Sequence, residues 1–146
     1  MGLETTLKPW SVSTAAYDGA LRFECEKMHP RMITRELRIG LIMVELLIPN
    51  LQPGADKSWP NDGRVQFTWI GQCGFDVRVS LKVGNIYQLW IRKVKKLPSD
   101  IILHSSSWDC LSGRIEIMLH TNVTYSWLPM LHVKGLDQAS SDENDD

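Results

Sequence analysis

The sequence has little net charge, few cysteines and no long apolar run. Its 146 residues carry a formal net charge of −1, so we expect no specific binding to nucleic acid. The three cysteines are an odd count, which argues against a complete disulfide framework. The longest apolar stretch, residues 39–48, is interrupted by Gly40 and Glu45 and is too short to span a bilayer. No secretory signal opens the chain, so we expect a protein that is not secreted.

The chain also lacks the short motifs that mark catalytic or phosphate-binding sites. It contains no G-x-S-x-G, no G-x-x-x-x-G-K-[ST], no H-E-x-x-H and no C-x-x-C. Cys25, His29, His104 and Cys110 could supply four zinc ligands, but their spacing matches no standard zinc module. We therefore expect no catalytic residue, no metal and no cofactor, and we predict that the protein is not an enzyme. The alternative is a small enzyme with scattered Cys and His residues.

Residues 33–48 carry the strongest helical pattern. At about 100° per residue, five apolar side chains share one face: Ile33, Leu37, Leu41, Val44 and Ile48. Arginines cluster opposite them, and Pro49-Asn50 closes the segment. A strand fits less well, because between residues 37 and 48 neither the odd-numbered nor the even-numbered positions are consistently polar. We predict a helix that lies across a sheet.

Alternation of apolar and polar residues predicts strands in the rest of the chain. The clearest are residues 64–69, 75–83 and 86–94, with a two-residue turn at Gly84-Asn85 between the last two. Weaker patterns indicate short strands, and Gly- or Ser-rich stretches indicate loops. The strand segments are 21–26, 101–104, 113–121 and 123–127, and the loops are 51–62 and 105–112.

The predicted fold class is α+β. We expect an antiparallel sheet of about five to six strands with one main amphipathic helix packed on it. An irregular N-terminal arm covers residues 1–19, a single domain covers 20–136, and a disordered acidic tail covers 137–146.

Tryptophan is abundant, with six residues in the chain. Trp69, Trp90 and Trp127 are expected to pack inside the domain. The other three lie in the predicted arm and loops, where each either clamps its loop or anchors a partner: Trp10, Trp59 and Trp108. They are our candidates for partner binding.

Charge is concentrated in two segments of the chain. The basic run Arg92, Lys93, Lys95 and Lys96 is either a solvated strand end or a functional patch. The functional alternatives are weak contact with an anionic membrane, contact with nucleic acid, or a nuclear import signal. The acidic tail holds Ser140, a candidate phosphorylation site because an acid follows three residues later. At the other end, Gly2 matches the myristoylation pattern, which gives only weak membrane contact by itself.

Two segments resemble a known family. The stretch Ser112-Gly113-Arg114-Ile115-Glu116-Ile117-Met118-Leu119-His120 is similar to a strand of rhabdovirus matrix proteins, and residues 21–47 follow the preceding strand–helix unit of that core. In size and tryptophan content the chain looks more like the small accessory proteins encoded beside the matrix gene. The matrix proteins have a Lys-rich N-terminus that is missing here.

The resemblance implies a non-enzymatic viral accessory protein. It would act as a protein-interaction module in the infected cell, in the host cytoplasm or nucleus, and would bind a host or viral protein. The alternative is a matrix-like structural protein that forms homo-oligomers and contacts membrane or nucleocapsid.

Overall fold

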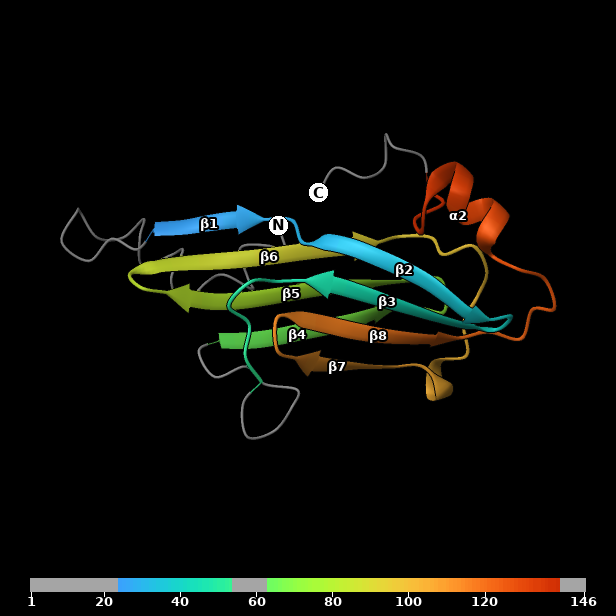
Figure 1. Cartoon of the computed structure of the whole chain (residues 1–146), viewed down its shortest axis with the longest axis horizontal. Helices are drawn as coiled ribbons and strands as arrows, with labels where there is room; N and C mark the ends of the chain where they lie inside the picture. The colour runs from blue at the N-terminus through green and yellow to red at the C-terminus, as the bar shows by residue number, and fades with distance from the viewer. Residues whose placement is uncertain (1–23, 54–62, 140–146) are drawn as a thin grey trace.

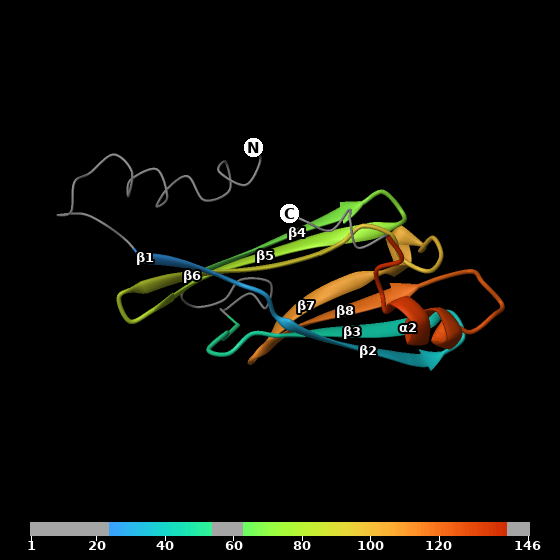
Figure 2. The same ribbon diagram turned by 90° about the horizontal axis from the view of Figure 1, so that it is seen from above.

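Two four-stranded β-sheets face each other in the computed structural model, which describes residues 24–53 and 63–139 (Figures 1 and 2). Sheet A has the order β1 (Glu24–Met28), β6 (Ile86–Val94), β5 (Gly74–Val83) and β4 (Gly63–Ile70). Sheet B has the order β2 (Arg31–Arg38), β3 (Leu41–Leu47), β8 (Arg114–His120) and β7 (Ser107–Leu111). A 3₁₀ turn, η1 (Leu103–Ser105), and a helix, α2 (Leu128–Lys134), complete the described elements.

One stretch of chain forms an edge of both sheets. β1 runs parallel to β6 as far as Met28, which lies opposite Trp90, and β2 then pairs with β3 in the other sheet. The change of sheet falls at His29-Pro30, where Pro30 is buried. Proline has no N–H to donate, so it ends the β1 ladder at this point. The sandwich is therefore tied together along one side.

The predicted helix over residues 33–48 is wrong, because this segment is the hairpin of β2 and β3. Ile39 and Gly40 form the turn, and Gly40 has a φ of 91°, which glycine adopts without steric penalty. Along β3, buried residues alternate with half-buried ones that are also mostly apolar. Both faces of β3 are therefore mostly apolar, so the sequence shows no clear alternation of polar and apolar residues there.

The predicted α+β class and the predicted count of five to six strands are also wrong, because the segment predicted as the main helix forms two strands instead. The structure is mostly β, and its one described helix is the short α2 at the end of the domain. Residues 105–112, predicted as a loop, contain β7, whereas 101–104 and 123–127 form no strand. The predictions for 64–69, 75–83, 86–94 and 113–121 are confirmed by β4, β5, β6 and β8.

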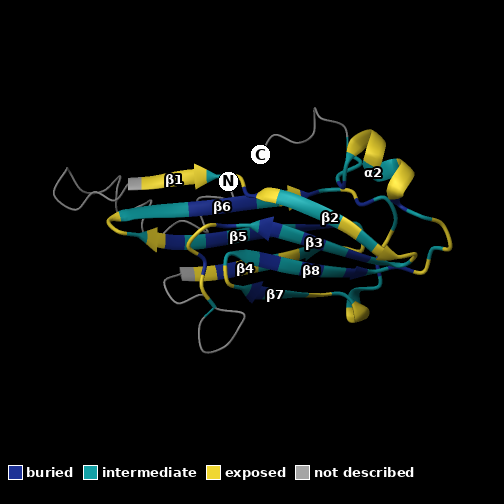
Figure 3. Ribbon diagram, in the orientation of Figure 1, coloured by how far each residue is buried: buried dark blue, intermediate teal, exposed yellow. Residues whose placement is uncertain are grey.

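The core lies between the two sheets. β3 and β8 contribute inward residues such as Val44 and Ile117, and β5 contributes Phe75 and Val79 from the opposite layer. The largest fully buried side chain is Trp127, which enters the core from the segment before α2. Burial follows the strand alternation closely, as Figure 3 shows for the alternating bands on β3, β5 and β8.

The first residues of the predicted acidic tail are hydrogen-bonded to the domain. The Asp137 carboxylate accepts bonds from the backbone N–H groups of Lys95 and Lys96, each at 3.1 Å. Gln138 N–H donates to the Lys96 carbonyl at 2.6 Å. The rest of the tail, from residue 140, and the predicted arm lie outside the described residues.

Candidate interaction surface

Exposed apolar side chains gather at one end of the sandwich. Among the described residues, five large hydrophobic side chains are exposed: Leu37, Ile39, Tyr125, Leu128 and Val133. Two of them lie at the β2–β3 turn and three lie on residues 125–133, and both segments are at the same end of the molecule (Figures 1 and 3). We call these five residues the apolar end. Exposed large apolar side chains at one end of a domain are typical of a contact site.

The Glu36 carboxylate holds these two segments together. Its Oε1 accepts a hydrogen bond from the Ser126 hydroxyl at 2.6 Å, and its Oε2 accepts one from the Trp127 N–H at 2.8 Å. The Ser126 oxygen in turn accepts the Leu128 N–H at 3.0 Å, at the start of α2. The β-bulge between Glu36 and Arg38 lies at the same place on β2. We call this arrangement the Glu36 clamp.

Two buried side chains fix α2 in the structure. Trp127 precedes the helix and is 0% exposed, and its Nε1 donates to the Ser99 hydroxyl at 3.1 Å. Leu136 follows the helix and is also in the core. Between these two anchors, Leu128 is 57% and Val133 is 79% exposed. The exposure of these residues is therefore imposed by the anchoring of the helix.

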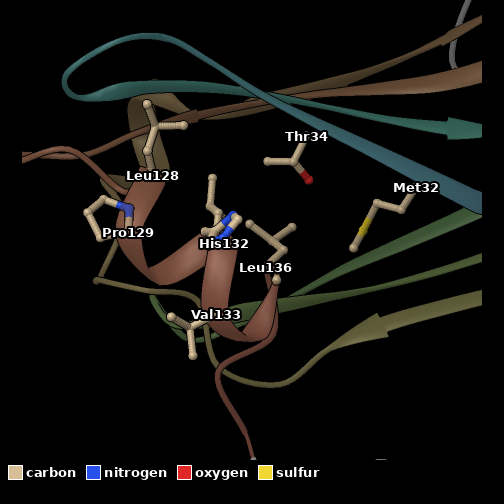
Figure 4. A pocket seen from close by; sticks show the side chains of 9 residues that line it. Met32, Thr34, Leu128, Pro129, His132, Val133 and Leu136 are labelled. Carbon is tan, nitrogen blue, oxygen red and sulfur yellow. The ribbon is translucent and has the colours of Figure 1, made fainter.

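An open apolar groove of about 850 Å³ separates β2 from α2 (Figure 4). Met32 and Thr34 line it from the inward face of β2. Leu128, His132 and Leu136 line it from the helix side. A cleft with mostly apolar walls and a few polar groups is the usual form of a binding site.

The strand beside the groove is basic. Arg31 and Arg38 are exposed, and Arg35 approaches Glu45 at 3.7 Å with 58% of its side chain still exposed. Glu45 also contacts Arg114 at 3.3 Å, and Glu36, the carboxylate on β2 itself, belongs to the clamp. Positive charge is therefore in excess along β2.

Comparison with known proteins gives little for this chain. No protein family and no curated protein matches it. Among solved structures, it is similar to the solution structure of the CS domain of the human KIAA1068 protein, with 15% sequence identity and a TM-score of 0.44, over 86% of this chain and 89% of that chain. A likeness this distant carries no information on function.

The tryptophan candidates lie away from the apolar end or outside the described residues. Trp108 is on β7, where its ring stacks on Phe67 with centroids 5.3 Å apart and planes at 5°. Phe67 also contacts Trp69 edge-on at 4.7 Å. This stack joins β4 to β7 and closes that side of the sandwich, so Trp108 has a packing role. Trp10 and Trp59 lie outside the described residues.

The structure does not gather the basic run into one surface. Arg92 and Lys93 point to opposite faces of β6, since Arg92 shares the parity of the core residues Trp90 and Val94. Lys95 and Lys96 follow the strand, where Asp137 binds their backbone. Gly2 and Ser140, the two candidate modification sites, lie outside the described residues.

Cys25 and Cys110 do not show the features of an activated nucleophile. Cys110 is fully buried, and burial raises the pKa of its thiol from 9.0 to about 11, with a smaller contribution from Asp109. Partial loss of solvation also raises the pKa of the Cys25 thiol. A catalytic thiol needs the opposite shift, because the thiolate is the reactive form. Among residues 24–53 and 63–139, no three His, Cys, Asp or Glu side chains converge as metal ligands.

Cys110 should resist alkylation in the folded protein. At pH 8, iodoacetamide should label the exposed Cys25 well before Cys110, as read by mass spectrometry of the native chain. Because its pKa is raised on folding, the Cys110 thiol stabilises the fold below pH 9.0 and loses this contribution as the pH rises to about 11. Equal labelling rates for the two thiols would contradict this account and favour an active thiol.

The helix that forms the apolar end was missed by the sequence analysis, although it had one signal. Pro129 lies at the first turn of α2, where its missing N–H is tolerated and its fixed φ suits a helix. The sequence pattern predicts a strand over residues 123–127, and the same proline indicates only that this strand lies at an edge or ends there. Seven residues are too few to show a helical period. No helix in the described part of the chain is long and apolar enough to cross a membrane.

Proposed function

We propose that this protein is a non-enzymatic interaction module that binds an apolar segment of another protein in the groove between β2 and α2. The observation that carries the proposal is the apolar end, to which every exposed large hydrophobic side chain of the described residues belongs; two of them, Leu128 and Val133, also line the groove. Covering such side chains contributes about 25 cal/mol per Å² of apolar area, which is the main driving force of protein association.

The anchoring of α2 supports this function. Trp127, Leu136 and the Glu36 clamp hold the helix before any partner arrives. A preformed site avoids the entropic cost of ordering a loop on binding. The partner would then insert side chains beside Leu128 and Val133, and would be a host or viral protein if the accessory-protein resemblance holds.

The matrix-like alternative has less support. Membrane or nucleocapsid contact by the basic run would need its four side chains on one surface, and Arg92 and Lys93 lie on opposite faces of β6. Basic side chains that are scattered in this way bind an anionic surface weakly.

A library of displayed random peptides, selected on the immobilised full chain, tests the proposed function. Selected peptides should bind at least about tenfold more weakly to Leu128→Lys and Val133→Lys variants, because a lysine there would be buried by the partner. Both sites are exposed, so the substitutions should leave folding intact.

A Gln66→Lys variant is the matched control, because Gln66 is exposed on β4 of the other sheet and the change adds the same charge. Selected peptides should bind this control and the wild type equally. Peptides that bind all variants equally, or a selection that yields no sequence, would show that the apolar end is not the binding site.

A further inference from the structure

The strand that lines the groove is an edge strand. In the order β2-β3-β8-β7, β2 has β3 as its single strand neighbour within the described part of the chain. β2 is eight residues long and ends in a β-bulge. The backbone groups along the outer edge of such a strand can pair with an extended peptide. The groove therefore has a main-chain recognition element as one wall.

Alternate side chains of β2 lie on opposite faces of sheet B and so in two different environments. Met32 and Thr34 face the groove, on the same side as the core residues Val44 and Leu46 opposite them. Arg31 and Arg35 have the other parity and lie on the outer face of sheet B. An added strand would follow the same pleat, so its side chains would point alternately toward α2 and toward the arginines.

The charges on β2 select the kind of strand that can be added. Arg31, Arg35 and Arg38 are three positive charges on one strand. The Glu36 carboxylate is bound by Ser126 and Trp127. Glu45 is shared between Arg35 at 3.7 Å and Arg114 at 3.3 Å, so it compensates the charge of Arg35 only in part. A second copy of β2 would bring arginines close to arginines, which is unfavourable across a strand pair. Acidic side chains on the partner would instead face the arginines.

We propose that the groove binds an extended segment of another protein, added as a strand on β2, in which apolar residues alternate with Asp or Glu. The apolar residues enter the groove between β2 and α2, and the acidic residues face Arg31 and Arg35. This inference rests on the proposed function and specifies the partner: a short segment with strand alternation and negative charge.

Three peptides of eight residues, the length of β2, test the pattern by fluorescence anisotropy. One alternates Val with Glu, one has the same composition in two blocks, and one alternates Val with Lys. Wild type should bind the first at least about tenfold more tightly than the other two. An Arg31→Glu/Arg35→Glu variant should reverse the preference between the Glu and Lys peptides. Equal binding of the alternating and block peptides, or no reversal, would overturn the inference.

A second measurement needs no change in the protein. Methylating the peptide amides on alternate residues removes the hydrogen-bond donors along one edge of the peptide only. One methylated series should lose binding by at least about tenfold, and the series of the other parity should bind like the parent. Loss of binding in neither series would overturn strand addition, yet the proposed function would stand if binding still depends on Val133.

Two other occupants of β2 give distinct results. A dimer seen by sedimentation, and lost in the Arg31→Glu/Arg35→Glu variant, would assign the edge to a second copy of the chain. Binding of phosphatidylserine vesicles through the same arginines, without binding of the Val/Glu peptide, would assign it to a membrane. Either result overturns the inference.

Discussion

Replacing Trp127 with alanine is expected to lower the free energy of unfolding by about 3–5 kcal/mol, the range for truncating a buried aromatic side chain. Trp127 is the largest of the fully buried side chains, and its Nε1 bond to Ser99 is lost as well. The resulting cavity would lie where the chain enters α2, so the groove should lose its helical wall. This loss is a large part of the 5–15 kcal/mol typical of a domain.

Urea unfolding followed by far-UV circular dichroism measures the effect. A Trp127→Phe variant is the matched control: it keeps most of the apolar volume and loses the bond to Ser99, so its loss should be about 1–2 kcal/mol. An alanine variant as stable as wild type would mean that α2 is not anchored by the core. The groove would then not be preformed by the core.

The sequence predicted the strands whose two faces differ in polarity. β4 and β5 pair in register along eight residues each, and their outward positions, such as Gln66 and Ser80, are polar. The period of two is therefore visible in the sequence. The turn at Gly84-Asn85 was equally readable, because a two-residue hairpin needs residues that tolerate positive φ, and Gly84 has a φ of 62°.

The prediction from sequence was wrong where tertiary contacts determine the secondary structure. In β3, Met43 and Leu47 are apolar although they point away from the core, and a run of this kind fits a helix as well as a strand. Gly40 was the contrary signal, since glycine is unfavourable inside a helix and common in a turn. The periodicity of a single segment contains no information about a partner strand such as β8, which lies far along the chain.

The candidate site depends on the same long-range contacts, and for that reason it could not be predicted. Leu128 and Val133 are unremarkable apolar residues in the sequence, and Glu36 is one acid among several. The fold brings Glu36 within 2.8 Å of the Trp127 N–H, 91 residues away, and so creates the groove. The basic character of the edge likewise appears only in the structure, where Glu36 binds Ser126 and Trp127 and Glu45 is shared between Arg35 and Arg114.

Replacing Glu36 with alanine is expected to lower the free energy of unfolding by about 2–3 kcal/mol. Two hydrogen bonds to a charged acceptor contribute about 3–6 kcal/mol when they are fully buried, and the half-exposed position of Glu36 lowers this sum. The Trp127 N–H and the Ser126 hydroxyl would both lose their acceptor. Glu36→Gln should lose less, about 1–2 kcal/mol, because one amide oxygen can still accept while the amide nitrogen faces a donor.

A double-mutant cycle of Glu36→Ala with Ser126→Ala isolates the clamp from other effects of the substitutions. The two changes should be coupled by about 1 kcal/mol, because the side chains share a hydrogen bond of 2.6 Å. Folded Glu36→Gln protein should also bind the selected peptides more weakly than wild type, since α2 is then held less firmly against β2. Strictly additive losses with unchanged peptide binding would show that the clamp does not shape the groove, and that Trp127 and Leu136 position α2 without it.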